Sequence, residues 1–311
     1  MDEKITVIIP TMNRVENLAQ TLSNLLLSSV IPSEIIVVDQ STNDDTKNMV
    51  SDLNTKLGAK GIIRYFHQDH PSLTAARNFG CSVASNDLLI FSDDDVDVEK
   101  DTIKNVALLM SDKSVSMIAG KNNLEKKSKS LLGYLFGFKS FKNRKIGHVT
   151  NSMLGRFPNK IKEKTKTMWA MGFFFAVRKK YILSWGLRWD EKLTGYAYAE
   201  DLDFSFSYYK KSIEQKLDCI LSSLVCVNHN CSAISRLTPR KVTFMYVLNR
   251  AYLLGKHNMV KKGKRCFDRV NRFLYLKRLF KKDNPKDIKD AIEYLDHNFD
   301  SVLNGEFNYG E

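Results

Sequence analysis

The sequence Leu88-Leu-Ile-Phe-Ser-Asp-Asp-Asp-Val-Asp-Val98 places three adjacent carboxylates directly after a short apolar run. The apolar run predicts a buried strand that ends at the carboxylates of Asp93, Asp94 and Asp95. Adjacent carboxylates repel one another, so a fold keeps them together where a positive group lies among them. Oxygen ligands at a strand end suit Mg²⁺ or Mn²⁺. The alternative is a solvated acidic turn before a helix that starts near Val98.

Two earlier strands end in a similar way. The β-branched run Ile5–Ile9 is closed by Pro10, and a second buried run, Ile35–Val38, stops at Asp39. Helical patterns separate these strands from one another and from a third strand at Ile62–Phe66. Strands and helices that alternate at this spacing predict an α/β fold with a mostly parallel, Rossmann-like sheet. Ligands bind such sheets at the C-terminal edge, where these strand ends meet.

The pattern is looser in the second half of the chain. Residues 121–166 are rich in Lys, Ser, Gly and Asn and predict an insertion made of loops that face the substrate. The expected elements around it are a helix at Val98–Met110, strands at Val115–Ala119 and Met168–Val177, two short strands at Leu217–Leu221 and Val225–Asn228, and C-terminal helices at Lys241–Lys256, Lys264–Lys281 and Pro285–Phe299.

The composition is that of a globular protein. Of the 311 residues 43% are hydrophobic and 27% are charged, which is enough to bury a sizeable core. We expect no secretory signal, because Met1–Lys4 runs straight into the first strand, and no apolar run approaches the length of a membrane span. The five cysteines form no Cys-x-x-Cys pair, which favours reduced thiols over disulfides or a structural zinc site.

The net charge of +13 is concentrated in one block. Between Arg236 and Lys286 there are 16 Lys or Arg and 2 Asp or Glu, a local charge of +14, so the rest of the chain carries 13 − 14 = −1. Aromatic and aliphatic residues alternate with the cations on predicted helices. This pattern favours an amphipathic helix on an anionic lipid surface over binding to nucleic acid, and the remaining alternative is a solvated helix face.

Several motifs in a fixed order resemble family 2 glycosyltransferases of the GT-A fold. The resemblance covers about residues 5–236, and it depends on the order of the motifs, since each motif alone is weak. The motifs are Ile-Pro-Thr-Met-Asn-Arg after the first strand, Val-Val-Asp-Gln-Ser-Thr-Asn-Asp-Asp-Thr after the second, Ala-Ala-Arg-Asn-Phe-Gly, the acidic strand end, Trp-Ala-Met-Gly-Phe-Phe-Phe-Ala-Val-Arg-Lys, Tyr-Ala-Glu-Asp-Leu-Asp-Phe, and a late strand with a histidine.

The resemblance implies a nucleotide-sugar donor, most often a UDP-sugar. Asp39 would accept a hydrogen bond from the base, and Arg77 would add positive charge near the diphosphate. Without the resemblance, Asp39 is equally well a loop or capping residue, and Arg77 a partner in a surface salt bridge. The residues implied for the nucleotide pocket are Pro10, Thr11, Asn13, Arg14, Asp39, Asp45 or its neighbour Asp44, Arg77, Asp93 and Asp94.

The resemblance also implies a divalent metal cofactor, Mn²⁺ or Mg²⁺. Asp95 would be the direct ligand and Asp93 would hold the ribose or a metal-bound water, while Asp94 could substitute for either. The late histidine, His229, would ligate the metal or touch the diphosphate. A lone histidine is more often structural.

Enzymes of this family invert the anomeric carbon by direct displacement, which needs one general base. The resemblance assigns that role to Asp201 and gives Glu200 a contact to the acceptor or to a neighbouring helix. The alternative is that both acids stabilise the start of a helix through its dipole. Trp169 and Gly172 would form the floor of the acceptor site, although packing alone could explain both.

These expectations combine into one prediction. Residues 1–236 form the glycosyltransferase domain, with a nucleotide-sugar half at 1–120 and an acceptor half at 121–236, and residues 237–311 form a basic helical extension. The protein transfers a single sugar to a saccharide or lipid-linked saccharide for surface polysaccharide, in the cytoplasm at the inner face of the plasma membrane. The alternatives are a non-catalytic nucleotide-sugar-binding relative, or a membrane- or nucleic-acid-binding protein that acts through its basic helices.

Overall fold

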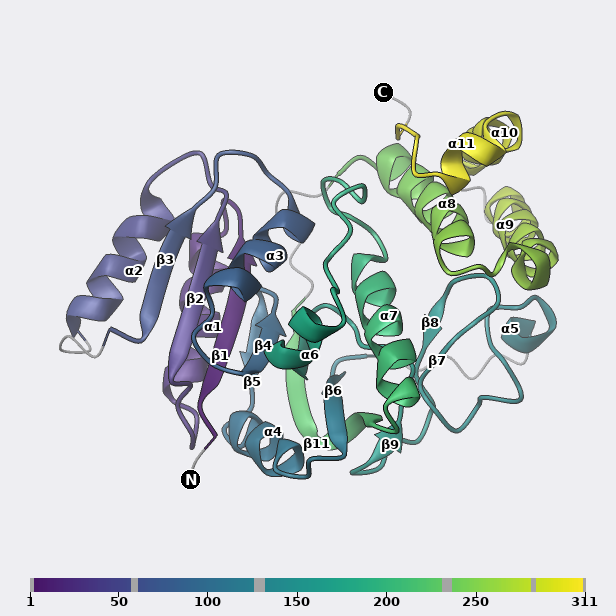
Figure 1. The fold of residues 1–311 in the computed structure, drawn as a ribbon. Helices are drawn as coiled ribbons and strands as arrows, with labels where there is room; N and C mark the ends of the chain where they lie inside the picture. The colour runs from purple at the N-terminus through teal and green to yellow at the C-terminus, as the bar shows by residue number, and fades with distance from the viewer. Residues whose placement is uncertain (1–2, 57–60, 126–131, 231–236, 281–283, 310–311) are drawn as a thin grey trace.

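The computed structural model describes residues 3–56, 61–125, 132–230, 237–280 and 284–309. One sheet runs through most of the first 230 residues (Figure 1) in the strand order β3-β2-β1-β4-β10-β6-β11-β5, with β9 paired to β11. The strands are β1 (Ile5–Thr11), β2 (Glu34–Asp39), β3 (Ile63–His67), β4 (Leu88–Ser92), β5 (Val96–Val98), β6 (Val115–Asn122), β9 (Thr165–Lys166), β10 (Phe174–Arg178) and β11 (Asp218–His229), and β7 (His148–Val149) with β8 (Gly155–Arg156) forms a separate hairpin.

Helices cover the sheet and build the C-terminal region at the upper right of Figure 1. None of the helices in the described ranges is long and apolar enough to cross a membrane. The helices are α1 (Val15–Leu26), α2 (Asp45–Lys56), α3 (Leu73–Val83), α4 (Thr102–Met110), α5 (Leu132–Leu135), α6 (Lys179–Ser184), α7 (Glu200–Glu214), α8 (Pro239–Lys256), α9 (Val260–Phe280), α10 (Lys286–His297) and α11 (Phe299–Leu303).

The first four strands form the predicted parallel half of the sheet. β1 pairs in parallel with β2 and with β4, and β2 pairs in parallel with β3. Thr11 lies opposite Asp39 at the carboxyl end of this half, and Asp93 follows the last residue of β4. The sheet edge that was expected to gather polar groups therefore does so. β10 then enters antiparallel between β4 and β6, which the alternating pattern did not predict.

The predicted strand Met168–Val177 is wrong in its first half. Only Phe174–Arg178 forms a strand, and the residues before it leave the sheet. Their backbone groups are satisfied by side chains instead of a strand ladder: Ala170 N donates to Ser205 Oγ at 2.9 Å, and Gly172 N donates to Asp201 Oδ2 at 2.8 Å. The apolar pattern of this segment therefore reflects burial beside α7, and not pairing.

Other predicted boundaries also change. The two short strands predicted between Leu217 and Asn228 are one strand, β11, whose pairing with β6 shifts register between Leu221 and Cys226. The expected helix at Val98–Met110 begins later, because Val98 still pairs with Val227 in the sheet. The described C-terminal part has four helices instead of three, since α11 follows α10 after a break at Asn298.

Helix α8 is buried against the second half of the sheet domain. Its residues Phe244, Leu248 and Tyr252 share one hydrophobic cluster with Val149 and Trp169. Arg250 of α8 is fully buried. Its guanidinium donates to the backbone oxygen of Ser152 at 3.1 Å and to the side chain of Asn271 on α9. The domain boundary predicted after residue 236 lies at the end of the segment 231–236, outside the described residues, and stays a prediction.

Candidate active site

The residues that follow β4 lie beside the end of β11. His229 Nε2 is 3.1 Å from Asp95 Oδ1 and 3.8 Å from Asp93 Oδ2. One candidate ligand atom from each of these three residues lies within 4.8 Å of the others. Burial acts to lower the pKa of His229, but its hydrogen bond to Asp95 and the charge on Asp93 raise the pKa overall. Two carboxylates and one imidazole at this separation fit a Mn²⁺ or Mg²⁺ ion.

Arg14 joins Asp94 to Asp95 at this strand end. Its Nη1 lies 2.7 Å from Asp94 Oδ1 and its Nη2 lies 2.6 Å from Asp95 Oδ2. Asp94 also accepts a hydrogen bond from Thr11 Oγ1 at 2.7 Å. Burial raises the pKa of Asp94 to about 7, although the charge of Arg14 acts in the opposite direction. The guanidinium is thus the positive group that keeps these acids together.

Arg77 connects the acidic cluster to the start of α7. It lies on α3, is almost fully buried, and its Nη2 is 2.9 Å from Asp93 Oδ1. Its Nη1 donates to Glu200 Oε1, and its Nη2 also donates to the backbone oxygen of Gly172 at 3.1 Å. The alternative of a surface salt bridge for Arg77 is therefore wrong, because the side chain is buried. The guanidinium is a buried link between Asp93 and Glu200.

Asp201 is held by backbone groups on both sides. Gly172 N donates to Asp201 Oδ2 at 2.8 Å, and Leu202 N donates to Asp201 Oδ1 at 2.7 Å. A Cβ at position 172 would lie 3.0 Å from Arg77 Nη2 and 3.2 Å from the Cβ of Asp201, so this position suits glycine. Burial raises the pKa of Asp201 despite these hydrogen bonds. A carboxylate with a raised pKa is a better proton acceptor.

Glu200 is the more deeply buried member of the acidic pair, with 5% of its surface exposed. Burial raises its pKa to about 7 although the Arg77 charge lowers it, and the neighbouring Asp201 charge raises it further. Its Oε2 has no hydrogen-bond partner among the described residues. Two adjacent buried acids with raised pKa values are typical of catalytic sites.

A strained loop brings these two acids into place. Ala197 and Ala199 have φ values of 51° and 68°, and Gly195 has 63°. Non-glycine residues rarely adopt this left-handed conformation, and such strain concentrates at functional sites. Glu200 N donates to Ala197 O at 2.9 Å, so the loop turns directly into α7.

The residues predicted to line the nucleotide pocket continue along the same sheet edge. Asp39 is fully buried and accepts hydrogen bonds from Ser41 N and from Tyr65 Oη, both at 2.9 Å. Asn13 N donates to Ser41 Oγ at 2.8 Å, which joins the loop after β1 to the loop after β2. Pro10 lies inside β1, and Asp45 is exposed at the start of α2, where it contacts Asn43 of its own loop. Asp39 and Asn13 therefore lie where the loops after β1 and β2 contact each other, whereas Asp45 is exposed to solvent.

A cleft of about 310 Å³ opens between the acidic cluster and the C-terminal half. Trp169 lines it from one side, 4% exposed, and stacks on Phe157 with ring centroids 4.7 Å apart. Residues 153–156 of the β7–β8 hairpin line the cleft beside Trp169, whose Nε1 donates to the backbone oxygen of Arg156 at 3.3 Å. That the insertion faces the substrate stays a prediction. Other lining residues are Arg77, Asp93, Met153, Leu154, Gly155, Arg156, Gly172, Phe173, Tyr196, Tyr198, Glu200, Asp201 and His229.

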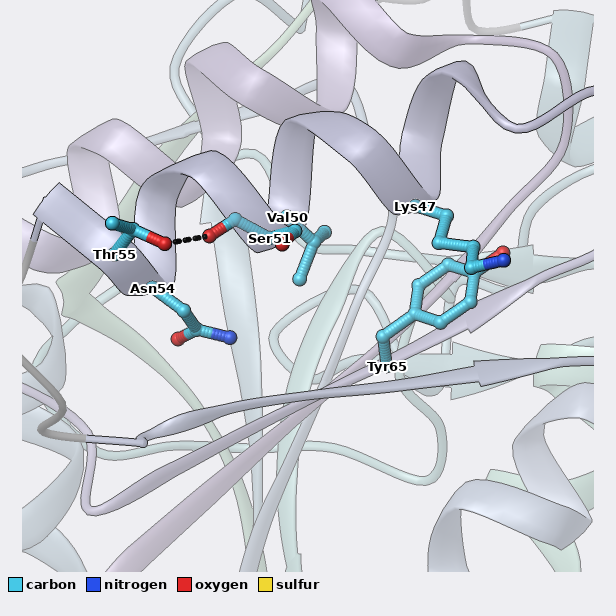
Figure 2. Close-up of a pocket in the computed structure, with 6 residues that line it drawn as sticks. All are labelled: Lys47, Val50, Ser51, Asn54, Thr55 and Tyr65. Carbon is cyan, nitrogen blue, oxygen red and sulfur yellow. Dashed lines mark hydrogen bonds between the residues drawn. The ribbon is translucent and has the colours of Figure 1, made fainter.

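A second hollow, of about 660 Å³, lies between α2 and β3. Figure 2 shows its six lining side chains, five from one face of α2 and the sixth, Tyr65, from β3. None of the six is a carboxylate. Tyr65 links the hollow to Asp39, a residue of the predicted nucleotide pocket, because its hydroxyl donates to that carboxylate.

Three contacts at the site were not predicted. Phe173 stacks on His229 with ring centroids 5.2 Å apart, Thr21 Oγ1 donates to the backbone oxygen of Asp94 at 2.8 Å, and Tyr65 binds Asp39. Phe173 belongs to the motif Trp-Ala-Met-Gly-Phe-Phe-Phe-Ala-Val-Arg-Lys, and its aromatic ring is the feature of the sequence that could have indicated a stacking contact. Thr21 and Tyr65 carry no signal, because each belongs to an ordinary helix or strand pattern.

Residues 6–185 match the family model described as glycosyl transferase family 2, more than half of the chain. The chain belongs to this family of transferases. Its fold is the GT-A fold. The matched region includes Arg14, Asp39, Arg77, the Asp93–Asp95 cluster and Gly172, and it ends before Glu200 and Asp201.

Relatives of the family 2 chain are distant. This chain is 28% identical over 200 residues to the GalNAc(5)-diNAcBac-PP-undecaprenol β-1,3-glucosyltransferase of Campylobacter jejuni. The aligned region covers 62% of this chain and 56% of that one. The chain spans between 13% and 56% of the lengths of the curated relatives it matches.

Solved structures of similar fold include two with nucleotide-sugars. One is the mannosyltransferase PcManGT of Pyrobaculum calidifontis in complex with GDP-Man and Mn²⁺, with a TM-score of 0.54, 14% identity, and coverage of 96% of this chain and 76% of that one. The other is TarS 1–349 of S. aureus in complex with UDP-GlcNAc, with a TM-score of 0.52, 16% identity, and coverage of 89% and 73%.

Proposed function

We propose that this family 2 protein is an inverting, metal-dependent glycosyltransferase that moves one sugar from a nucleotide-sugar to a saccharide or lipid-linked saccharide. One observation carries the proposal: Arg77 spans from Asp93 in the acidic cluster to Glu200, the neighbour of Asp201. The metal end of the site and the candidate base are therefore separated by a single guanidinium, and both face one cleft.

In this mechanism the carboxylate of Asp201 takes the proton of the acceptor hydroxyl. The acceptor oxygen forms a bond to the anomeric carbon from the face opposite the leaving group, while the bond from that carbon to the diphosphate oxygen breaks. The electron pair leaves with the nucleoside diphosphate. One displacement of this kind inverts the configuration of the anomeric carbon, and a positioned base contributes roughly 10²–10⁴-fold to the rate.

Asp95, Asp93 and His229 are the residues that would hold Mn²⁺ or Mg²⁺. A bound ion there would supply positive charge for the diphosphate leaving group. Arg77 is too deeply buried between Asp93 and Glu200 to move freely, so it acts as a fixed charge in the wall of the cleft.

The donor is proposed to be a UDP-sugar. Support comes from Asp39, whose buried carboxylate lies at the sheet edge beside Asn13 and Tyr65, and from the solved TarS complex with UDP-GlcNAc. The mannosyltransferase of similar fold is in complex with GDP-Man, so a GDP-sugar is the principal competitor. A lipid-linked acceptor is supported by the Campylobacter relative, which is named for an undecaprenol-linked substrate. We infer a role in surface polysaccharide biosynthesis in the cytoplasm.

The test measures thermal stabilisation of the full chain by UDP-, GDP-, dTDP- and CMP-sugars, with Mn²⁺ and with chelator. We expect a UDP-sugar to raise the melting temperature only with Mn²⁺, and Asp95→Asn to abolish that rise. Incubation of that donor with candidate acceptors then gives a product whose anomeric configuration is read by NMR. A retained configuration would contradict the mechanism. Stabilisation without transfer to any acceptor would favour a non-catalytic nucleotide-sugar-binding protein.

A further inference from the structure

The outer face of α9 carries a stripe of cations that continues into a stripe of apolar side chains. The residues of this stripe recur every three or four positions between Arg265 and Leu279, and Phe280 follows Leu276 by four, so all of them lie on one side of the helix. All are exposed, with 48% of the surface of Leu276, 45% of Leu279 and 86% of Phe280 open to solvent. We call this face the α9 stripe; it consists of Arg265, Arg269, Arg272, Leu276, Leu279 and Phe280.

The insertion after β6 extends the α9 stripe. Phe136 stacks on Phe273 of α9 with ring centroids 4.2 Å apart, and Arg269 Nη1 donates to the backbone oxygen of Leu135 at 3.4 Å. These contacts hold α5 against α9, as the right side of Figure 1 shows. Leu135 and Phe141 are 65% and 62% exposed. Two further exposed apolar side chains, Leu135 and Phe141, thus belong to a segment that contacts α9.

Among the described residues of α9, cations outnumber acids. Helix α9 has eight Lys or Arg and one acid, Asp268, which is bound to Lys264 at 2.7 Å. Lys142, Arg144 and Lys145 follow Phe141 directly and are exposed. Large exposed apolar side chains next to an excess of cations are typical of a surface that meets another molecule.

We propose that the α9 stripe, with Leu135 and Phe141, docks on an anionic lipid bilayer. The arginines lie at the level of the headgroup phosphates, and Leu276, Leu279 and Phe280 enter the boundary between headgroups and acyl chains. Nucleic acid fits less well. Proteins that bind single-stranded nucleic acid stack its bases on aromatic side chains. A duplex is bound mainly through its phosphates, which make no favourable contact with three exposed apolar side chains.

The opposite face of α9 lies against the loop that leads to the cleft. A side chain at Gly263 would collide with the backbone oxygen of Asn151. Arg250 ties Asn271 of α9 to Ser152, and Met153, the next residue, lines the cleft. A docked α9 therefore brings the acceptor side of the cleft close to the bilayer. This step rests on the proposed function, because it gives the membrane surface a role in presenting a lipid-linked acceptor.

The experiment measures co-sedimentation of the full chain with vesicles of phosphatidylcholine alone and of phosphatidylcholine with 30% phosphatidylglycerol, in about 150 mM salt. We expect binding to the anionic vesicles and at least tenfold weaker binding to the neutral ones. Each arginine near an anionic surface contributes about fivefold to the affinity, so R265Q/R272Q is expected to weaken binding roughly 30-fold. The variant L276S/L279S/F280S is expected to lose binding to both vesicles.

Matched controls change similar exposed residues of the sheet domain. Leu27, Leu108 and Leu183 are 75%, 62% and 65% exposed, so L27S/L108S/L183S removes comparable apolar surface. K100Q/K104Q removes two exposed cations. Both controls are expected to bind vesicles as the wild type does, and thermal melting verifies that every variant is folded.

The proposal is overturned if the wild type does not bind anionic vesicles, or if the two α9 variants bind as tightly as their controls. It is also overturned if a DNA or RNA duplex competes fully for the same surface, or if the apolar variant instead abolishes a concentration-dependent dimer. Vesicle binding is measured without donor or acceptor. A failed docking prediction therefore leaves the transferase proposal intact, and the reverse also holds.

Discussion

The guanidinium of Arg14 binds one carboxylate oxygen of Asp95, with its Nη2 2.6 Å from Oδ2. His229 lies 3.1 Å from the other oxygen, so both oxygens of the predicted metal ligand already have neighbours. An ion that binds Asp95 must therefore compete with Arg14 or share the carboxylate with it. This relationship makes Arg14 an internal counter-charge for the acidic cluster.

Arg14→Gln is expected to lower stability without metal and to increase the stabilisation by Mn²⁺. Loss of one partner of a buried ion pair costs about 3 kcal/mol, and the remaining carboxylates attract the cation more strongly. Melting temperatures of wild type and variant over a Mn²⁺ titration measure both effects. Arg64→Gln is the matched control, because Arg64 pairs with Glu34 away from the cluster. Equal Mn²⁺ responses in both variants would argue against competition at Asp95.

Asp201→Asn is expected to reduce transfer by about 10³-fold, within the usual range for loss of a general base. The amide keeps the shape of the side chain, so nucleotide binding stays close to that of the wild type. Initial rates together with the thermal shift by donor and Mn²⁺ separate the two effects. A variant that transfers sugar at the wild-type rate would exclude Asp201 as the base.

Gly172→Ala is expected to lower the transfer rate by on the order of 10²-fold with a small change in stability. The new methyl group would press on Arg77 and on Asp201, which have no free space at this position. Gly133→Ala is the matched control, since its Cβ would meet only the flexible side chain of Lys139 at ordinary distances. Rates and melting temperatures of both variants test the steric explanation, which fails if the two behave alike.

The pH dependence of stability is expected to contain a contribution from Glu200. Its pKa is raised to about 7 in the folded protein from an ordinary value near 4.5, so between these pH values the folded state holds a proton that the unfolded state releases. Stability from this group is complete below about pH 4.5 and is lost as the pH rises to about 7. The total change is up to about 3 kcal/mol.

Glu200→Gln cannot titrate and is expected to lack this contribution. The stability difference between wild type and variant should therefore fall from pH 5 to pH 7 and stay constant above, as measured by denaturant unfolding at each pH. Glu293→Gln, at an exposed pair with Lys289, serves as the control and should show no such slope. A constant difference for Glu200→Gln over this range would mean that Glu200 ionises normally.

Asp203 has a structural role although it belongs to the same sequence motif as Asp201. It is 1% exposed and binds His257 Nε2 at 2.9 Å and Lys256 Nζ at 2.7 Å, which anchors the end of α8 on α7. Asp203→Asn is expected to lower the free energy of unfolding by about 3 kcal/mol. Glu214→Gln breaks an exposed pair with Lys211 and should cost less than about 1 kcal/mol. Equal losses in chemical denaturation would contradict this assignment.

Local patterns were sufficient to predict the first four strands, the acidic strand end and the family. Each of these depends on residues that are close in sequence: an apolar run followed by a polar stop, or a motif of a few residues. The strand ends at Asp39 and Asp93 lie at the same edge of the sheet, as predicted, because parallel strands joined by helices place their carboxyl ends at one edge.

Only the folded chain reveals which groups pair across long separations. Arg77 and Glu200 are 123 positions apart, and nothing local indicates that one guanidinium joins them. The antiparallel entry of β10 between β4 and β6 has no local signal either. Gly172 lies outside the sheet, and its backbone N–H donates to Asp201 of α7 instead of a neighbouring strand. Burial also raises the pKa of Glu200, because desolvation depends on the surrounding protein and not on sequence neighbours. The types of group at the site are visible in the sequence, whereas their pairing and ionisation are properties of the tertiary structure.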